Sequence, residues 1–530
     1  MDISIFEVVG PKMMGPSSSA TAGMARIGST MHKFLTGPLK SIDLRFVPSK
    51  EQGYFSCRSH LGLIGGTIGL SPDDVRLRNA MDIAKEQGIE LSFSIFKEPA
   101  PVMPLTVQIT CEQKNGETHT VRGVSVGGGS ISIEMVDGFE VQPASTEAHL
   151  FIYADKDISE GLDQKLPGCK FDFDKQGEKY MFCVSIDPKK KDELEKAAAA
   201  IDGATRVQYI EPFIPLGFIP HEPLFTNYSD LIQMSKDTGK SIPELTIEYE
   251  MGRSGRTREE IWNNMAEFLE VMKTSARECI EGEIIPLYGY EVGDCGKKMM
   301  AAYKQDKLLG GTILPKAIAL ALGIMEYSMS CHCIIAAPTG GSSGIVPGCI
   351  LTVAEEHGYT DKQLIESLFV AAAIGVVMYY HDVSFSGSNG GCQGEVGVSS
   401  AMAAGALAYL GGGDADVICQ AGALAMKNIL GLLCDPIEGC PEVPCIKRNG
   451  IGVGNAFSGC DMALSGVRSF IPPDEVIDSL AHSQEKLFRG AIRQLRNTEG
   501  IGAAWTPTGK ASMKRSCELC RDILLPKKEW

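Results

Sequence analysis

The stretch from Ser386 to Leu410 reads SGSNGGCQGEVGVSSAMAAGALAYL and changes character at Gly397. Before Gly397, glycines and polar residues surround Cys392, which is typical of a tight turn that brings backbone close to a ligand. After Gly397, small and apolar residues continue without interruption, which predicts a buried helix over 397–410. The pattern indicates a thiol presented at the edge of a helical core.

Long apolar runs of the same kind fill the second half of the chain. Helices that are apolar on nearly every side are usually buried by other helices. Residues 226–530 are therefore predicted to form an all-α domain whose short connections carry the polar chemistry. Further helices are expected over Arg258 to Glu281, Pro315 to Ser330, Lys362 to Tyr380, Asp414 to Leu433 and Pro473 to Leu495.

The first half of the chain is of a different type. Residues 1–146 contain alternating apolar segments, such as Leu105 to Thr110, which predict the strands of an α/β sandwich domain. Residues 147–213 predict a smaller unit of βαββα order, and a proline-rich linker follows it. The expected fold class is multidomain α/β plus all-α. The elements expected in the smaller unit are a strand at 149–153, a helix near 158–166, a strand at 180–186 and a helix at 191–201.

Length and charge limit the possible functions. With 530 residues, the chain exceeds the size at which one hydrophobic core stops growing. Its formal net charge of -16 opposes a nucleic-acid partner, because binding to phosphates depends on Lys and Arg. The first residues do not resemble an export signal, and the most apolar stretches are shorter than a bilayer requires or are interrupted by Gly and polar residues. A cytoplasmic protein without a membrane partner is expected.

Seventeen cysteines are spread over the chain, and three of them stand out. Disulfides are a poor explanation without an oxidising compartment, so buried thiols and metal ligands remain. Cys392, Cys434 and Cys445 each lie at a helix edge or in a turn marked by Gly or Pro. Three loop thiolates can hold three irons of a cubane and leave the fourth iron open as a Lewis acid. Their separations of 42 and 11 positions match no compact ferredoxin spacing, so spacing alone leaves buried thiols as the alternative.

Four separated motifs follow one another in the second half of the chain. They read Ala336-Ala-Pro-Thr-Gly-Gly341, Gly390-Gly-Cys-Gln-Gly-Glu-Val-Gly397, Cys434-Asp-Pro436 and Val443-Pro-Cys-Ile-Lys-Arg-Asn449. In this order they resemble the α domain of bacterial iron-sulfur L-serine dehydratases, over about residues 336–510 with a similar closing segment from Thr506 to Lys510. The resemblance implies a 4Fe-4S cluster on Cys392, Cys434 and Cys445, and the dehydration of L-serine to pyruvate and ammonia.

The N-terminal half resembles the β domain of the same family. The family's hydroxyl-rich loop is similar to the stretch from Gly15, and the resemblance implies that Ser17, Ser18 and Ser19 bind the substrate carboxylate. Ala20 stands where the family has a histidine, and a methyl group can neither donate a hydrogen bond nor move a proton. A different small hydroxy or thiol acid is therefore the alternative substrate.

A second candidate anion site is a Gly-rich loop whose consecutive backbone N–H groups can form a nest. Pyridoxal-phosphate enzymes hold phosphate in such loops, but no segment of the first half offers a convincing Schiff-base lysine, so a carboxylate is the preferred ligand. The loop consists of Thr339, Gly340, Gly341, Ser342 and Ser343.

Two histidines are candidates for the base that removes the Cα proton. His60 lies in a segment similar to a family loop that reads Gly-His-Gly-Thr-Asp, although only Ser59-His60-Leu61-Gly62 is present here. His381 precedes the loop that leads to Cys392, but it could equally cap the C-terminus of a helix, where a cation is favoured.

The remaining expectations concern regulation and assembly. The 147–213 unit is similar to an ACT-type regulatory domain, but its first loop lacks the family's glycine signature, so a structural role is favoured. Cys517 and Cys520 form a C-x-x-C pair that could reach a cluster, whereas Cys331-His332-Cys333 is expected to be buried in a strand. A homodimer is expected because symmetric dimers are the commonest assemblies. A non-catalytic iron-sulfur redox sensor is the alternative from another class of protein.

Overall fold

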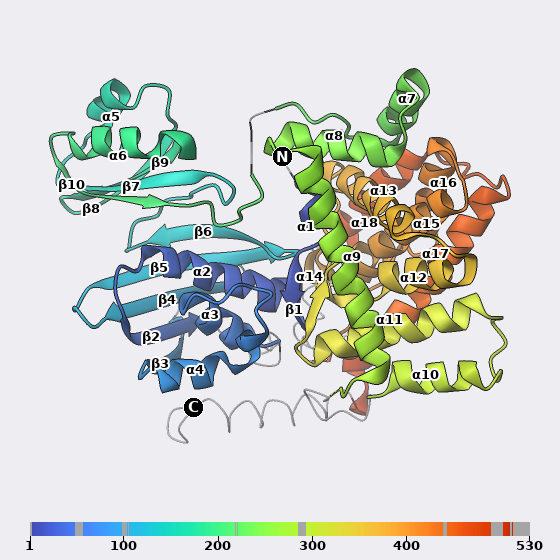
Figure 1. Ribbon diagram of the computed structural model, residues 1–530. Helices are drawn as coiled ribbons and strands as arrows, with labels where there is room; N and C mark the ends of the chain where they lie inside the picture. Colours follow the sequence, from blue (N-terminus) through green and yellow to red (C-terminus); the bar gives the residue numbers. More distant parts are fainter. Residues whose placement is uncertain are drawn as a thin grey trace. The chain divides into compact units, whose positions relative to one another are not determined.

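The computed structural model describes residues 3–47, 57–97, 103, 105–217, 219, 221–284, 293–437, 442–488, 502–508 and 511. The chain divides into two units. We call Ser19–Gln52 with Arg58–Phe218 the α/β unit, and Met1–Ser18, Gly53–Cys57 and Ile219–Trp530 the helical unit. The predicted combination of α/β and helical parts is confirmed (Figure 1).

Two apolar helices form the centre of the helical unit. Every residue of α15 (Val398–Leu410) except Tyr409 is buried. The helix packs against α13 (Asp361–Tyr380), and a Cβ atom at Gly405 would lie 3.0 Å from Ile374, so the absence of a side chain permits this close approach. Among the described residues, α13 alone is long and apolar enough to cross a membrane, but 78% of that stretch is buried inside the protein, as in the core helix of a globular domain.

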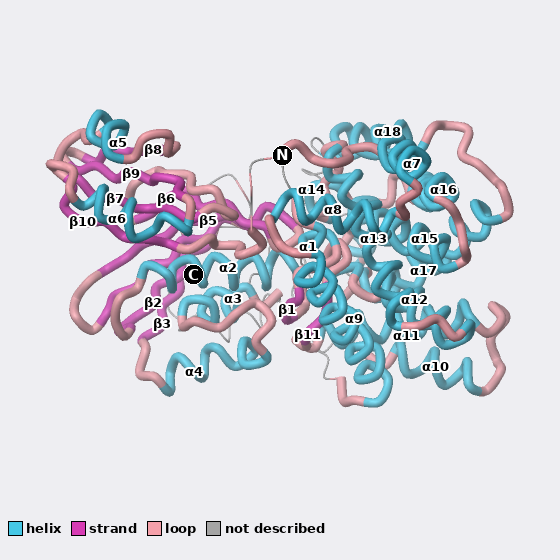
Figure 2. The backbone as a smooth tube through the Cα atoms, turned by 45° about the horizontal axis from the view of Figure 1, so that its top comes forward, coloured by secondary structure: helices cyan, strands magenta, loops and turns pink. Residues whose placement is uncertain are grey.

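The other helices of this unit pack around that pair and on one another (Figure 2). The predicted helix over 414–433 ends earlier, at Lys427, and the chain then turns through Gly431, whose φ of 87° suits glycine. The helix predicted to reach Leu495 is described only to Phe488. The remaining helices are α7 (Tyr228–Thr238), α8 (Ile242–Ser254), α9 (Arg258–Glu281), α10 (Cys295–Lys304), α11 (Ile313–Met329), α12 (Ile345–His357), α14 (Gly387–Gly390), α16 (Ala415–Lys427), α17 (Cys445–Leu464) and α18 (Pro473–Phe488).

The N-terminal segment belongs to the helical unit, which differs from its predicted place in a domain of residues 1–146. After the short helix α1 (Ile5–Val8), strand β1 (Lys12–Met14) pairs antiparallel with β11 (Cys333–Ile335). The helical unit is therefore not purely α-helical. The pairing places the chain that follows β1 beside the Gly-rich loop that follows β11.

A buried ion pair anchors this N-terminal segment. Glu250 accepts hydrogen bonds from the Ser4 hydroxyl at 2.9 Å and from the Ile5 backbone N–H at 3.0 Å. It also pairs with Arg253 at 3.0 Å, and both charged side chains are fully buried. Removing one partner of a buried pair leaves an uncompensated charge, which costs far more than breaking a surface pair.

We therefore expect Arg253→Met to destabilise the helical unit by about 3–5 kcal/mol, because Glu250 would remain buried without its cation. Thermal unfolding would measure the loss. The double variant Glu250→Gln/Arg253→Met, which removes both charges, should recover much of it. Lys240→Met, which breaks the exposed Lys240–Glu248 pair, should cost at most about 1 kcal/mol. Equal stability of the single variant and the wild type would contradict the anchoring role.

The α/β unit contains two sheets. The first has the order β3-β2-β4-β5-β6, in which only β2 and β3 are parallel to each other. The backbones of helices α2 (Met24–Phe34) and α3 (Ser59–Thr67) are in direct contact. A Cβ atom at Gly66 would lie only 2.1 Å from the Ala25 carbonyl oxygen, so this contact requires glycine. The remaining elements are β2 (Leu39–Phe46), α4 (Ala80–Glu86), β3 (Glu90–Ile95), β4 (Thr106–Gln113), β5 (Thr118–Gly127) and β6 (Ser130–Val136).

The second sheet adds one strand, β10, to the predicted βαββα order. Its order is β10-β7-β9-β8 and all its pairs are antiparallel, which gives the βαββαβ arrangement of ferredoxin-like domains. The two strands for which the sequence predicted no residue range are the edge strands β8 and β10, which bury too few residues to show a clear apolar alternation. The elements are β7 (Ala148–Ala154), α5 (Ser159–Lys165), β8 (Phe171–Gln176), β9 (Lys179–Ile186), α6 (Lys191–Ala199) and β10 (Ala204–Ile210).

Both faces of this second sheet are covered within the α/β unit. Leu150 and Ile152 of β7 lie in the core beneath α5 and α6. On the opposite face, Phe151 packs edge-to-face against Phe34 of α2 at 5.0 Å, and the Tyr153 hydroxyl donates to Asp137 at 2.5 Å. The small sheet thus packs against α2 and the turn that follows β6.

Candidate metal centre

Thiols from separate loops converge in the helical unit. The Cys392 and Cys434 sulfurs and a carboxylate oxygen of Glu395 all lie within 4.8 Å of one another. Cys392 precedes a π-helical turn, Gln393–Gly397, that leads directly into α15. The structure therefore brings two of the three predicted ligands together and adds a carboxylate that the sequence analysis did not select.

Cys445, the third predicted ligand, lies close enough to act electrostatically on the other two. It is the first residue of α17 and is buried, as are Cys392 and Cys434. Burial, Glu395 and Cys434 raise the pKa of the Cys445 thiol well above its ordinary value. A hydrogen bond to Cys434 and burial likewise raise the pKa of the Cys392 thiol. Because metal ligation requires the thiolate form, a metal that binds these thiols would have to displace their protons.

Glycines and a glutamine set the positions of these loops. Gly391 has a φ of 75°, which few residues other than glycine adopt, and a Cβ atom at Gly387 would lie 2.4 Å from a Glu395 carboxylate oxygen. The Gln393 backbone N–H donates to the Leu432 carbonyl at 3.1 Å, and its side-chain oxygen accepts from the Gly431 N–H at 2.7 Å. These bonds join the Cys392 loop to the chain that leads to Cys434.

Asn449 connects α17 to the Gly-rich loop. Its side-chain N–H₂ donates to the backbone oxygens of Gly341 and Cys445, each at 2.9 Å, and its side-chain oxygen accepts from the Gly344 N–H at 3.1 Å. The residue is fully buried. Asn449 thus fixes the Gly-rich loop relative to the helix that begins with Cys445.

Asn449→Ala should destabilise the protein by about 1–3 kcal/mol, because buried backbone donors and acceptors would lose their partner. We expect a lower melting temperature and weaker metal binding in the same variant. Asn455→Ala, which removes a half-buried asparagine of the same helix, provides the matched control. An unchanged melting temperature in Asn449→Ala would show that the loop does not depend on this side chain.

Glu395, Arg448 and Asn449 are the site residues that the sequence analysis missed. Each stands three or four residues after a predicted cysteine ligand, a spacing that places side chains on one face of a helix. The quoted motifs contained all three. The signal was therefore present, but charged and amide side chains at such positions are usually solvent-exposed.

The predicted carboxylate-binding residues have different surroundings. The Thr339 hydroxyl donates a hydrogen bond to Glu395 at 2.8 Å, so Thr339 lies beside the cluster of Cys392, Glu395 and Cys434. The Ser342 hydroxyl donates to the Ala337 carbonyl at 3.1 Å, and the Ser343 hydroxyl lies 3.9 Å from the Met325 sulfur. Both serines are fully buried, so their hydroxyls stabilise the loop from inside.

The hydroxyl-rich loop meets the Gly-rich loop at a glycine. A Cβ atom at Gly340 would lie 3.0 Å from the Ser18 backbone nitrogen and 3.1 Å from the Pro16 carbonyl oxygen. The helical unit thus brings Ser17 and Ser18 beside the Gly-rich loop, whereas Ser19 belongs to the α/β unit. The Gly341 carbonyl oxygen accepts the hydrogen bond from Asn449, and a Cβ atom at Gly341 would lie 3.1 Å from a Glu395 carboxylate oxygen.

The two candidate bases lie in different units. His60 is buried in the first turn of α3, in the α/β unit. His381 is the C-cap of α13, where its Nδ1 lies 2.6 Å from an Asp478 carboxylate oxygen and its Nε2 lies 3.1 Å from the Asn227 side-chain oxygen. His381 therefore joins three helices and has both ring nitrogens engaged.

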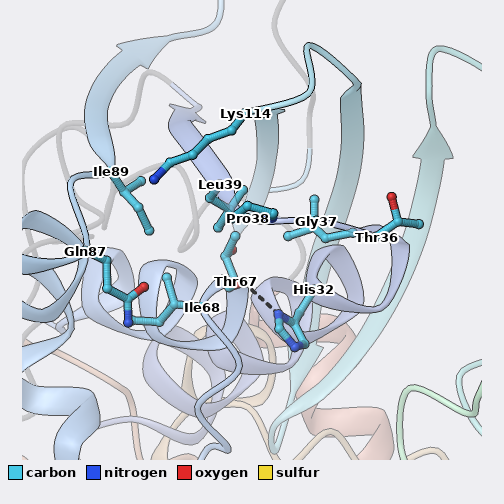
Figure 3. Close-up of a pocket in the computed structure, with 11 residues that line it drawn as sticks. His32, Thr36, Gly37, Pro38, Leu39, Thr67, Ile68, Gln87, Ile89 and Lys114 are labelled. Carbon is cyan, nitrogen blue, oxygen red and sulfur yellow. Dashed lines mark hydrogen bonds between the residues drawn. The ribbon is translucent and has the colours of Figure 1, made fainter.

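Other predicted features have separate locations. Cys331 and His332 precede strand β11, which begins at Cys333, and the His332 ring stacks on Tyr327 with centroids 4.2 Å apart. Cys517 and Cys520 lie outside the described residues. A hollow of about 550 Å³ in the α/β unit is lined by His32, Thr67 and Lys114 among others, and by none of the predicted site residues (Figure 3).

Fold and site together define a protein whose helical core presents thiol and carboxylate donors suited to a soft metal ion or an iron-sulfur cluster. Residues 237–494 match the family model described as serine dehydratase alpha chain. The chain belongs to the L-serine dehydratase family.

Three relatives illustrate the match. A probable L-serine dehydratase alpha chain of Bacillus subtilis is 38% identical over 55% of this chain and 95% of the relative. The L-serine dehydratase alpha chain of Peptoniphilus asaccharolyticus is 34% identical over 53% of this chain and 94% of the relative. L-serine dehydratase 2 of Escherichia coli is 33% identical over 53% of this chain and 61% of the relative.

Proposed function

We propose that this protein is a lyase that converts L-serine to pyruvate and ammonia, with a 4Fe-4S cluster held by Cys392, Cys434 and Cys445. The observation that carries the proposal is the group of buried thiols in a chain whose relatives are named L-serine dehydratases. Thiolates are the usual ligands of iron-sulfur clusters, so the donor set fits. When bound, a cluster with three protein ligands would supply a Lewis acid for the departing hydroxyl.

The protein's own groups would bind and orient the substrate. Hydroxyls of the stretch from Ser17 and backbone N–H groups of the Thr339 to Ser343 loop are candidates for binding the carboxylate. Loss of the Cα proton to a histidine and of the β-hydroxyl as water leaves an enamine, which becomes an imine and is hydrolysed to pyruvate and ammonia. Overall, serine is converted without any net oxidation or reduction.

Glu395 is the candidate for binding the substrate ammonium group. Its carboxylate lies beside the thiols, accepts a hydrogen bond from the Thr339 hydroxyl, and lies so close to Gly341 and Gly387 that a Cβ atom there would be 3.1 Å and 2.4 Å from its oxygens. A carboxylate attracts an ammonium group and repels a second carboxylate. This arrangement favours a hydroxy amino acid over a hydroxy acid, even though Ala20 replaces the family histidine.

Glu395→Gln should raise the KM for L-serine about 10–100-fold, because a hydrogen bond to a charged group contributes about 1.5–3 kcal/mol. The iron content should remain that of the wild type. Steady-state kinetics and iron analysis of the same preparation measure both quantities. A loss of iron in this variant would instead identify Glu395 as a metal ligand.

Anaerobic purification followed by iron and sulfide analysis, and then by assays on a panel of substrates, tests the proposal. We expect about four irons and four sulfides per chain, and turnover of L-serine but not of hydroxy acids or thiol acids. Zinc in place of iron would refute the cluster. A cluster without turnover on any substrate would favour the redox-sensor alternative.

We also propose that the protein is a cytoplasmic homodimer. Analytical ultracentrifugation would test the oligomeric state.

A further inference from the structure

Arg448 contacts two cysteine loops from the helix that carries the third cysteine. Its Nη1 donates to the Cys392 sulfur at 2.9 Å and to the Leu433 carbonyl oxygen at 2.6 Å. Its Nη2 forms an ion pair with the Asp435 carboxylate. Leu433 and Asp435 flank Cys434 on either side, so a single guanidinium group joins the Cys392 loop to the Cys434 loop.

The position of Arg448 in α17 also connects the third cysteine, Cys445, to the other two loops. Arg448 stands three residues after Cys445, close to one helical turn, so the same short segment carries a thiol and the group that contacts the other two loops. The Arg448 side chain is 18% exposed and that of Asp435 is 12% exposed, so solvent screens their interaction less than it screens a surface pair.

The chemistry of a guanidinium group suits this arrangement. It is planar, always charged and carries five N–H donors, so it can bind a sulfur, a carbonyl oxygen and a carboxylate at once. Its charge also offsets the mutual repulsion of thiolates that must lie side by side in a buried site. The hydrogen bonds of Gln393 also join the Cys392 loop to the chain before Cys434, so the two loops keep a connection that does not involve Arg448.

We propose that Arg448 is a positioning residue that gathers the Cys392, Cys434 and Cys445 thiols into a metal-accepting arrangement before any metal is bound. This inference rests on the proposed cluster site. It concerns the thiols themselves, so it can be tested on cluster-free protein without reference to turnover.

The experiment titrates cluster-free, reduced full-length protein with Cd²⁺ and follows the ultraviolet absorbance of the thiolate-to-metal bonds. Wild-type protein should bind one Cd²⁺ with the absorbance of several thiolates. Arg448→Ala should bind it about 10–100-fold more weakly, the usual effect of losing a group that orients metal ligands. Arg448→Lys should fall between them, because lysine keeps the charge but lacks the planar fork. Iron and sulfide content after reconstitution should follow the same order.

Arg468→Ala is the matched control. Arg468 pairs with Asp416, and its side chain is 53% exposed. This variant should bind Cd²⁺ like the wild type. Melting temperatures of all variants establish that weaker binding does not reflect unfolding, and Arg448→Lys decides the comparison if Arg448→Ala does not fold.

Undiminished Cd²⁺ affinity in the folded Arg448 variants would overturn the inference and leave the proposed cluster intact. Failure of the cluster proposal would look different. In that case the wild-type protein would take up neither Cd²⁺ nor iron through these cysteines, which would overturn both the cluster site and the role of Arg448.

Discussion

Cys434→Ser is expected to abolish both the visible absorbance of the cluster and the turnover of L-serine. The replacement removes a soft thiolate from a group that lies within 4.8 Å of Cys392 and Glu395, and a serine hydroxyl is a poor substitute for a thiolate as an iron ligand. Lewis-acid assistance contributes several kcal/mol, and each 1.36 kcal/mol corresponds to a factor of ten in rate, so activity should fall about a thousandfold or more. Cys392→Ser and Cys445→Ser should behave alike.

The measurement combines anaerobic absorbance spectra, iron analysis and pyruvate formation for each variant. Cys349→Ala is a suitable control, because Cys349 is a fully buried cysteine of α12 in the same unit. It should keep the cluster and the activity, whatever its effect on stability. Normal activity in any of the three serine variants would remove that cysteine from the set of ligands.

The sequence contained enough information to predict the helical core and the cysteine loops. Apolar runs such as the one in α15 are buried on all sides, so composition alone indicates their environment. Glycines mark the turn before Cys392 because the backbone there adopts a positive φ and approaches Glu395 closely. These are local constraints, and local constraints are visible in a sequence.

The parts that were not predicted depend on contacts between distant segments. The pairing of β1 with β11 joins residues near the start of the chain to residues beyond its middle, and three residues of strand give no periodic signal. Glu250 and Arg253 appear in the sequence as an ordinary helical i,i+3 pair, yet both are fully buried against the N-terminal segment. Arg448 likewise has no distinguishing feature until the cysteine loops surround it.

The choice between the two candidate bases can now be argued from hydrogen bonding. Both ring nitrogens of His381 face oxygen atoms, one of Asp478 and one of Asn227. The orientation of the Asn227 amide is fixed because its N–H₂ group donates to Asp230 at 3.1 Å. Both ring nitrogens are thus engaged by side chains of other helices, so His381 is better suited to joining helices than to acting as a base.

His60→Ala should therefore lower the kcat for L-serine about 100–10,000-fold, the usual contribution of a general base, while the cluster absorbance and iron content stay at wild-type levels. His381→Ala should show the opposite pattern. It should lower the melting temperature, because α13 loses its links to α7 and α18, and it should leave the kcat of the folded protein nearly unchanged. Steady-state kinetics on iron-replete protein, together with thermal unfolding, distinguish the two variants. If kcat falls in His381→Ala and not in His60→Ala, the assignment of the base must be reversed, and the contacts of His381 would have to rearrange when substrate binds.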